Sequence, residues 1–294
     1  MHRGYYRFNV FHTPCELQLF GKDKTQTDEA AHAILKTAKR LEKQYSFFDP
    51  DSYLNRIINR RSSGVVELDA ESAAILTKVR ELSEKVNHRF DITLGTIKGC
   101  FDLPTLDQIK QCREAKRSYC GPDQWRVSKK RLYVETPHTL FDLGGVIKEY
   151  AVDEAVKILK RHKVTAGMIN FGGDLYAHGA HPDGRPFEVG IKDPYDTSHN
   201  VATVSLQDAA LTTSAHYERS REVEGERISH IMTGEACRSD LLSATVVASS
   251  ALWCGIATTA MMVDGTIIPV EGEWLRVSQA AGVETSEGLL AKID

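Results

Sequence analysis

The first 21 residues lack an apolar run long enough for a signal peptide or a membrane-spanning helix. The chain also lacks a CxxC pair, because its six cysteines are scattered from Cys15 to Cys254. That spacing argues against a zinc site and a dense disulfide framework, and it is typical of a reducing compartment. No HExxH pair is present, which excludes a zinc protease of that type. We expect a cytoplasmic protein without a membrane span; export stays open if a preceding signal has been removed.

The chain has no strong excess of charge of either sign. Its 37 Lys and Arg residues and 40 Asp and Glu residues give a net charge of -3, which supplies no electrostatic basis for nucleic acid or anionic membrane as the main partner. Its 294 residues are enough for one large domain or two small ones. No repeat, low-complexity segment or Pro/Gly/Ser-rich linker divides the chain, so we predict one domain over residues 1–294.

Strand and helix patterns follow one another without strict alternation, which favours the α+β class with mixed or antiparallel sheets and packed helices. Helices are predicted over residues 27–46, with Thr27 or Asp28 as the N-cap, and over 70–87. Residues 104–122 are polar and ambiguous. Strands are expected at 5–21, 64–69, 125–135, 166–179, 187–194, 201–206 and 209–215, and the last at 273–278.

The segment FDLGGVIKEYAVDEA, residues 141–155, places an acid, a glycine pair and a lysine where a strand becomes a helix. The two glycines let the backbone approach a bulky ligand, and the helix N-terminus offers free N–H donors to an anion. Lys148 adds a point charge suited to a phosphate, and Asp142 can accept a hydrogen bond from a ribose hydroxyl or a ring N–H. An ordinary capped helix after a glycine turn explains the motif equally well.

Three further segments carry polar or small residues suited to a site. NFGGD, residues 170–174, is an ordinary hairpin turn or a place of close backbone approach. His216 and His230 lie near the ends of adjacent expected strands, which suggests acid–base work. In the small-residue helix GIATTAMM, residues 255–262, Thr258 and Thr259 face either the core or a ligand.

Taken in order, these segments resemble the FAD:protein FMN transferase family, often called ApbE, along nearly the whole chain. DLGGVIKEYAVD is similar to the family's DLGGIAKGYAVD, and FDITLG to its FDiTvGp. YSFFDPDSYLNRIIN, INFGGDLYAHG, VGIKDP, TTSAHYER and SHIMTG resemble further family segments in the same order. The resemblance implies a single ApbE-like domain that binds FAD and a divalent ion, usually Mg²⁺.

The implied reaction cleaves the FAD pyrophosphate, transfers FMN to a Thr or Ser hydroxyl of a target flavoprotein and releases AMP. Some members instead hydrolyse FAD to FMN and AMP. Carried onto this chain, His230 would assist proton transfer, and the Gly145 carbonyl and Thr259 would be metal ligands. The positions implied to contact FAD are Phe11, Phe48, Asp91, Ile92, Thr93, Asp142, Lys148 and Ile231. Phe48 would stack on the isoalloxazine, where the family usually has Tyr, and Phe11 would replace a Met.

The chain departs from the family pattern at the metal site. The family's last motif, aDAlaTAl, places a metal-ligand Asp where this chain has Gly255, and Glu149 stands where the family has Gly after the lysine. Thr96 replaces a usual Pro, and HIMTG lacks an Asp-Pro pair. At an effective dielectric of about 20, a carboxylate about 4 Å from a unit charge contributes on the order of 4 kcal/mol before desolvation. Either Glu149 or Asp240 supplies the missing ligand, or the protein binds flavin without transferring it.

Overall fold

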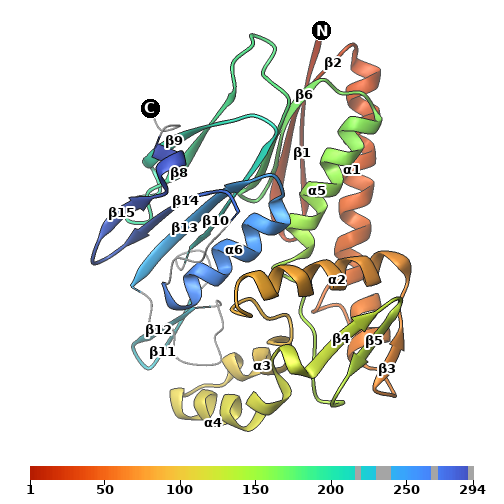
Figure 1. Ribbon diagram of the computed structural model, residues 1–294, viewed down its shortest axis with the longest axis vertical. Coiled ribbons are helices and arrows are strands. Elements are labelled where there is room, and N and C mark those ends of the chain that lie inside the picture. The colour runs from red at the N-terminus through yellow and green to blue at the C-terminus, as the bar shows by residue number, and fades with distance from the viewer. Residues whose placement is uncertain (216–219, 230–239, 266–270, 291–294) are drawn as a thin grey trace. The chain divides into compact units, whose positions relative to one another are not determined.

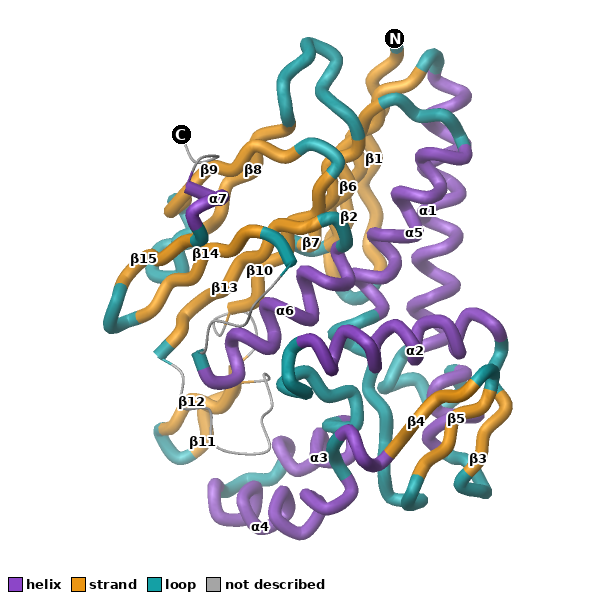
Figure 2. The backbone as a smooth tube through the Cα atoms, viewed as in Figure 1, coloured by secondary structure: helices purple, strands orange, loops and turns teal. Residues whose placement is uncertain are grey.

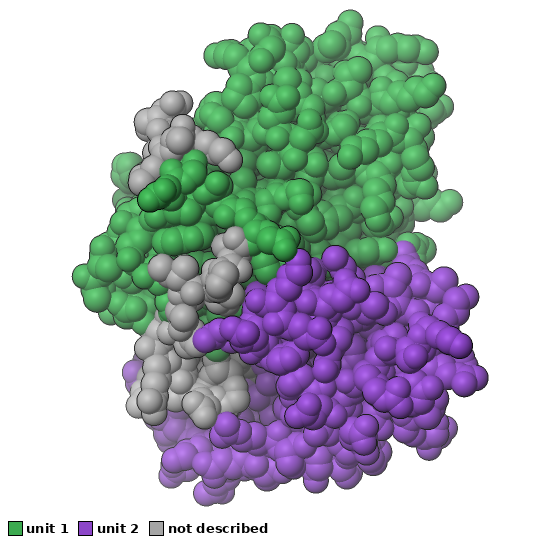
Figure 3. Space-filling model, in the orientation of Figure 1, with its two compact units in different colours: residues 1–42, 145–215, 240–294 green, residues 43–144, 216–239 purple. Residues whose placement is uncertain are grey.

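The computed structural model describes residues 1–215, 220–229, 240–265 and 271–290 (Figure 1). The chain forms two compact units, coloured separately in Figure 3. Unit 1 comprises Met1–Glu42, Gly145–Ala215 and Asp240–Asp294, and unit 2 comprises Lys43–Gly144 and His216–Ser239. A single domain over residues 1–294 stays a prediction. None of the helices in the described ranges combines the length and the apolar character that crossing a membrane requires.

An antiparallel sheet of eight strands forms the centre of unit 1 (Figure 2). The strands in spatial order are β1 (His2–Val10), β2 (Thr13–Gly21), β6 (Ala166–Phe171), β7 (Asp174–His178), β10 (Ala209–Ala215), β13 (Leu241–Ala248), β14 (Glu273–Ser278) and β15 (Gly282–Thr285). β15 and the short helix α7 (Glu287–Leu290) follow the last strand that the sequence pattern predicted.

The middle strands of this sheet are largely buried on both faces. The hairpin of β8 (Phe187–Lys192) and β9 (Asn200–Leu206) shares a hydrophobic cluster with one face, including Phe20, Val247 and Leu275. Helices α5 (Ile147–Arg161) and α6 (Ala251–Asp264) contact sheet strands and each other. Because both faces are buried, β13 reads as a nearly continuous apolar run and not as an alternating one.

Helix α1 (Lys24–Tyr45) begins three residues earlier than predicted. The Oδ1 atom of Asp23 accepts a hydrogen bond from the Gln26 amide at 2.9 Å, so Asp23 caps the helix. Thr27 lies inside the first turn, where its hydroxyl donates to the Lys24 carbonyl at 3.0 Å. The predicted caps Thr27 and Asp28 are therefore wrong, because an earlier acid occupies the capping position.

Unit 2 combines short strands with short helices. The helices and helical turns are η1 (Leu54–Asn59), α2 (Ala70–Lys85), α3 (Gly95–Lys98), η2 (Gly99–Asp102), α4 (Leu106–Lys116), η3 (Arg117–Tyr119) and η4 (Pro122–Gln124). The strands are β3 (Val65–Glu67), β5 (Arg131–Val134) and β4 (Trp125–Ser128) in one sheet, and β11 (Ser220–Val223) with β12 (Glu226–Ser229). α4 falls in the segment that was ambiguous from sequence; Thr105 caps it by accepting from the Gln108 amide at 3.3 Å.

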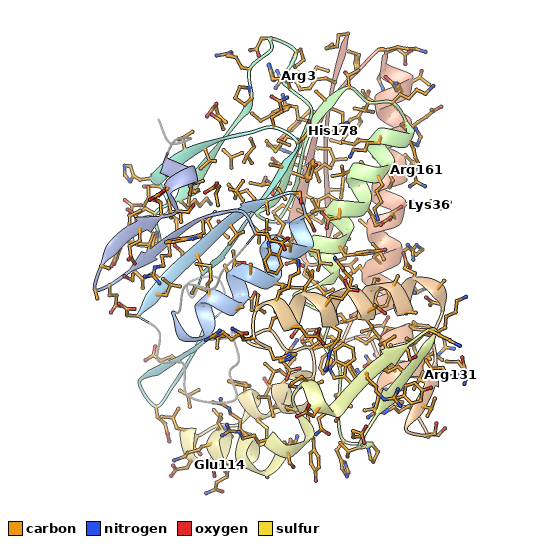
Figure 4. All side chains as sticks on the ribbon, viewed as in Figure 1. Arg3, Lys36, Glu114, Arg131, Arg161 and His178 are labelled. Atoms are coloured by element: carbon orange, nitrogen blue, oxygen red, sulfur yellow. A yellow bond between two sulfur atoms is a disulfide. The ribbon has the colours of Figure 1, made fainter. Side chains whose placement is uncertain are left out.

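A disulfide joins Cys100 in η2 to Cys112 in α4, the helix on which Figure 4 labels Glu114. Their Cα atoms lie 5.7 Å apart. The cysteine spacing did not predict this pairing, and the inference of a reducing compartment loses the support of these two residues. Location in the cytoplasm stays a prediction.

Asp153 on α5 holds the N-terminus of α6. Its carboxylate accepts from the Ser250 hydroxyl at 2.7 Å and from the amides of Ala251 and Leu252 at 2.8 and 3.2 Å. These amides belong to the first turn of α6, where no helical carbonyl is available to them. Burial raises the pKa of Asp153 above its ordinary value, while these hydrogen bonds act to lower it.

Replacing Asp153 with alanine should lower the free energy of unfolding by about 1–3 kcal/mol, because the α6 amides lose their acceptor. Urea denaturation measures this. Glu154→Ala is the matched control, since Glu154 on the same helix pairs with the exposed Lys157, at 2.6 Å; we expect a loss of less than about 0.5 kcal/mol there. Equal losses in the two variants would contradict the capping role.

Candidate functional site

Unit 2 brings together three of the segments that the sequence singled out. The Asp142 amide donates to the Ile92 carbonyl at 2.8 Å, which joins the DLGG segment to the FDIT segment. Asn59, at the end of η1, accepts from the Phe141 amide at 2.8 Å and donates to the Phe141 carbonyl at 3.0 Å. Asp142 is therefore held by a hydrogen bond from its own amide and by the two hydrogen bonds between Asn59 and the backbone of Phe141.

Gly95, at the start of α3, permits this approach. A Cβ at this position would lie 2.8 Å from the Leu140 carbonyl oxygen and 3.0 Å from the Asp142 amide nitrogen. Real Cβ contacts essentially never fall below 3.0 Å, so a side chain here would push the segment of Asp142 away. The glycine of FDITLG thus serves a close backbone contact.

The Asp142 carboxylate has two partners within unit 2. Its Oδ1 atom accepts from the Gly144 amide at 2.9 Å, and its Oδ2 atom pairs with the ammonium of Lys98. That ammonium also lies 4.9 Å from the ring centroid of Phe47 and 4.5 Å from that of Phe48. Sequence reasoning missed Lys98, because a lysine in a short helix carries no recognisable pattern.

Phe48, the residue expected to stack on the flavin, is 74% exposed. The loop that carries it wraps around Asn55, whose Nδ2 atom lies 2.7 Å from the carbonyl oxygens of both Phe47 and Asp49. An exposed aromatic on a held loop, next to a cation, is a surface on which a planar ring can stack.

The FDIT residues form a tight turn. Asp91 accepts from the amide and the hydroxyl of Thr93, and the Thr93 hydroxyl accepts from the Gly121 amide at 2.8 Å. The side chains of Ile92 and Thr93 are buried, so Asp91 and the backbone offer the accessible polar groups here. Burial raises the pKa of Asp91, while the hydrogen bonds from Thr93 oppose that rise.

In unit 1, Lys148 lies in the first turn of α5 and pairs with the buried carboxylate of Asp174. Asp174 begins β7 directly after the turn at Gly172 and Gly173, whose φ angles are +60° and +97°. Asn170 accepts from the Gly173 amide at 2.9 Å. NFGGD is therefore a hairpin turn, and it places a buried acid against the lysine of the DLGG segment.

Glu149 follows Lys148 and packs against Gly255 on α6. A Cβ at Gly255 would lie 2.7 Å from Glu149 Cγ, 3.3 Å from Cδ and 3.4 Å from Oε1. Glu149 is 6% exposed, and its buried Oε2 atom has no hydrogen-bond partner. The Lys148 ammonium lies 3.8 Å from Oε1. A buried carboxylate oxygen without a partner is compatible with a divalent cation, which prefers such oxygens.

The two threonines of α6 differ. Thr258 is buried; its hydroxyl donates to the Gly255 carbonyl at 3.1 Å and shares a hydrogen bond with Ser214 Oγ at 2.9 Å. Thr258 is thus a core residue, whereas Thr259 is only partly buried. Among the described residues, no group of three or more His, Cys, Asp or Glu could hold a metal ion. A cation here would rely on fewer carboxylates, together with carbonyl, hydroxyl and phosphate oxygens.

Two further candidate residues, Phe11 and Asp240, lie in unit 1. Phe11 sits in the turn between β1 and β2 with φ +58°, and its ring centroid lies 6.3 Å from that of Phe171. Asp240 is exposed and accepts from the Ala280 amide at 3.2 Å. His216, His230 and Ile231 lie outside the described residues.

Comparison with known proteins gives a consistent result. The ApbE family model matches residues 11–276. The FAD:protein FMN transferase of Salmonella typhimurium is 27% identical over 238 residues, spanning 75% of this chain and 67% of that protein. Its counterpart in Escherichia coli K12 is 26% identical over 262 residues, spanning 83% and 71%.

Solved structures show the same fold. The ApbE protein of Thermotoga maritima matches with a TM-score of 0.86 at 23% identity, over 100% of both chains. The flavin transferase ApbE of Vibrio cholerae matches with a TM-score of 0.83 at 19% identity, over 99% of both chains. The predicted α+β class with antiparallel sheets and packed helices is confirmed.

Gly95→Ala should destabilise the protein by about 1–3 kcal/mol, because the new Cβ would overlap backbone atoms that cannot rotate away. Gly99 provides the control: it has helical dihedral angles and nothing within 4 Å of an added Cβ. Gly99→Ala should be neutral, or stabilising by up to about 1 kcal/mol. Thermal melts of both variants measure the difference, and equal shifts would show that the packing at Gly95 does not matter.

Proposed function

The chain belongs to the ApbE family, and on that premise we propose that it transfers FMN from FAD to a Thr or Ser hydroxyl of a target flavoprotein, releasing AMP. The observation that carries the proposal is the joining of the DLGG and FDIT segments through the Asp142–Ile92 hydrogen bond. In unit 2 this bond holds an acid suited to a nucleotide, with an exposed aromatic and a lysine beside it.

Unit 2 carries groups suited to the ring system of FAD. Phe48 offers an exposed face on which the isoalloxazine can stack, and Asp142 offers oxygens to a ring N–H or a ribose hydroxyl. Lys98 orients the Asp142 carboxylate through their ion pair. Asp91 would contact the nucleotide beside it; at Ile92 and Thr93 the backbone would do so.

Unit 1 carries groups suited to phosphates. Lys148 carries the positive charge in the first turn of α5, and the amides of that turn point along the helix axis at its positive end. Both features favour an anion that gains charge as the pyrophosphate bond breaks. Gly145, which is exposed, adds no side chain that would block the approach.

The Gly145 carbonyl and the Thr259 hydroxyl would hold Mg²⁺, which supplies neutralisation of the leaving phosphate and a lowered pKa for the accepting hydroxyl when bound. The chain's own residues orient the substrate: Lys148 holds the phosphates and Asp142 holds the nucleotide. His230 would take the proton of the accepting Thr or Ser hydroxyl.

One incubation tests the proposal. The protein is mixed with FAD, Mg²⁺ and a flavoprotein fragment that carries an acceptor threonine, and the intact mass of the fragment is measured. We expect a gain equal to FMN less water, with AMP released in equal amount. AMP without a mass gain would indicate an FAD pyrophosphatase. Bound FAD with neither product would indicate a flavin-binding protein, and either result would overturn the transferase.

Lys148→Ala should weaken FAD binding roughly tenfold or more, because a charge-assisted contact to phosphate contributes about 1.5–3 kcal/mol. Fluorescence titration of FAD measures the affinity. Lys148→Gln is tested alongside, since it retains a donor for the buried Asp174. Lys157→Ala is the control on the exposed side of the same helix. Unchanged FAD affinity in folded Lys148 variants would show that the pyrophosphate is bound elsewhere.

A further inference from the structure

We propose that Glu149 is the carboxylate ligand of the divalent cation, in place of the aspartate that the ApbE pattern has at position 255. This inference rests on the proposed function for the presence of a cation. It concerns the two positions at which the chain departs most from the family pattern. Position 149 gains an acid and position 255 loses one, and the structure places Glu149 against Gly255.

The contact between α5 and α6 makes this exchange possible (Figure 1). The Glu149 side chain occupies the space in which a side chain of residue 255 would begin, 2.7 Å from Cγ to the Cβ position. Gly255 therefore leaves room for an acid that reaches over from α5. Residues 255 and 259 are one turn apart on the same face of α6, so Glu149 lies on the face that carries Thr259, the expected hydroxyl ligand.

Among the described residues, this cluster sets one ammonium against two carboxylates. The Lys148 ammonium serves both Asp174 and Glu149, whose side chains are only 3% and 8% exposed. With both carboxylates ionised, one negative charge would be left over in a buried environment, where an uncompensated ion costs several kcal/mol. A bound divalent cation would offset that charge, and the Glu149 Oε2 atom, buried and without a hydrogen-bond partner, would be its ligand.

A purely structural ion pair between Lys148 and Glu149 explains fewer of these observations. The Lys148 ammonium lies 3.8 Å from Oε1 and is already paired with Asp174. Such a pair leaves Oε2 buried without a hydrogen-bond partner. Asp240, the other acid considered from sequence, is exposed and accepts from the Ala280 amide. It therefore lacks the buried, unpartnered oxygen that Glu149 has.

Titration of the full chain with Mn²⁺, alone and with saturating FAD, tests the ligand directly by calorimetry. Glu149→Gln keeps the size of the side chain and removes its charge, and it should weaken Mn²⁺ binding at least tenfold. Glu154→Gln on the same helix and Asp240→Asn should leave Mn²⁺ affinity unchanged. Unchanged affinity in Glu149→Gln, a loss in Asp240→Asn instead, or no Mn²⁺ binding by the unaltered chain would overturn the proposal.

Returning the acid to α6 gives a stricter test. Gly255→Asp alone should lower the melting temperature, because its Cβ would overlap Glu149 Cγ. Glu149→Gly alone should lose Mn²⁺ affinity. The double variant Glu149→Gly/Gly255→Asp should recover both the melting temperature and most of the affinity, a strong non-additivity of the kind expected for residues in contact. A folded double variant that binds Mn²⁺ no better than Glu149→Gly would contradict the exchange.

Stability without metal separates the ligand from a structural partner of Lys148. Metal-free Glu149→Gln should melt at or above the temperature of the unaltered chain, since it removes the excess buried charge, and added Mn²⁺ should raise only the melting temperature of the unaltered chain. A marked loss of metal-free stability would favour the structural pair. Because these readouts are binding and melting, they hold whether or not FMN transfer is observed.

Discussion

The attachment of α5 to α6 is the interaction on which unit 1 depends. Asp153 accepts hydrogen bonds from the first turn of α6, which ties that helix to α5 and sets the register of the residues facing each other along them. Glu149 lies one helical turn before Asp153, and Gly255 lies in the second turn of α6. The contact between Glu149 and Gly255 follows from that register, and with it the placement of a buried carboxylate beside Lys148.

Gly95 and Gly255 both serve close approach, with different consequences. At Gly95 the neighbours are backbone atoms of the segment that leads to Asp142, so the missing side chain lets two parts of unit 2 join by hydrogen bonds. At Gly255 the neighbour is an acidic side chain, so the missing side chain leaves the space that Glu149 occupies. The first glycine permits a backbone contact and the second permits a contact with an acidic side chain, although the sequence shows both simply as glycine.

The fold and the details of the site vary independently. A chain that shares only 23% of its residues with the Thermotoga maritima structure matches it over its full length with a TM-score of 0.86. The sheet requires buried apolar residues of suitable size, and many sequences satisfy that requirement. A carboxylate needs only to reach the right point in space, and two helices packed side by side offer two places from which it can do so.

The sequence by itself determined the features that depend on near neighbours. The α+β class, the hairpin turn at Gly172 and Gly173, and the helix that starts after Gly145 follow from periodicity and turn residues, and the order of the motifs pointed to the family. Prediction from the sequence misplaced the start of α1, left α4 ambiguous and did not identify β15, because caps and edge strands give weak local signals. Only the tertiary structure decided the partners of residues far apart in the chain: the pairing of Cys100 with Cys112, the ion pair of Lys98 with Asp142, and the packing of Glu149 against Gly255. Such contacts depend on how helices and strands pack, and no periodicity in a single sequence records that.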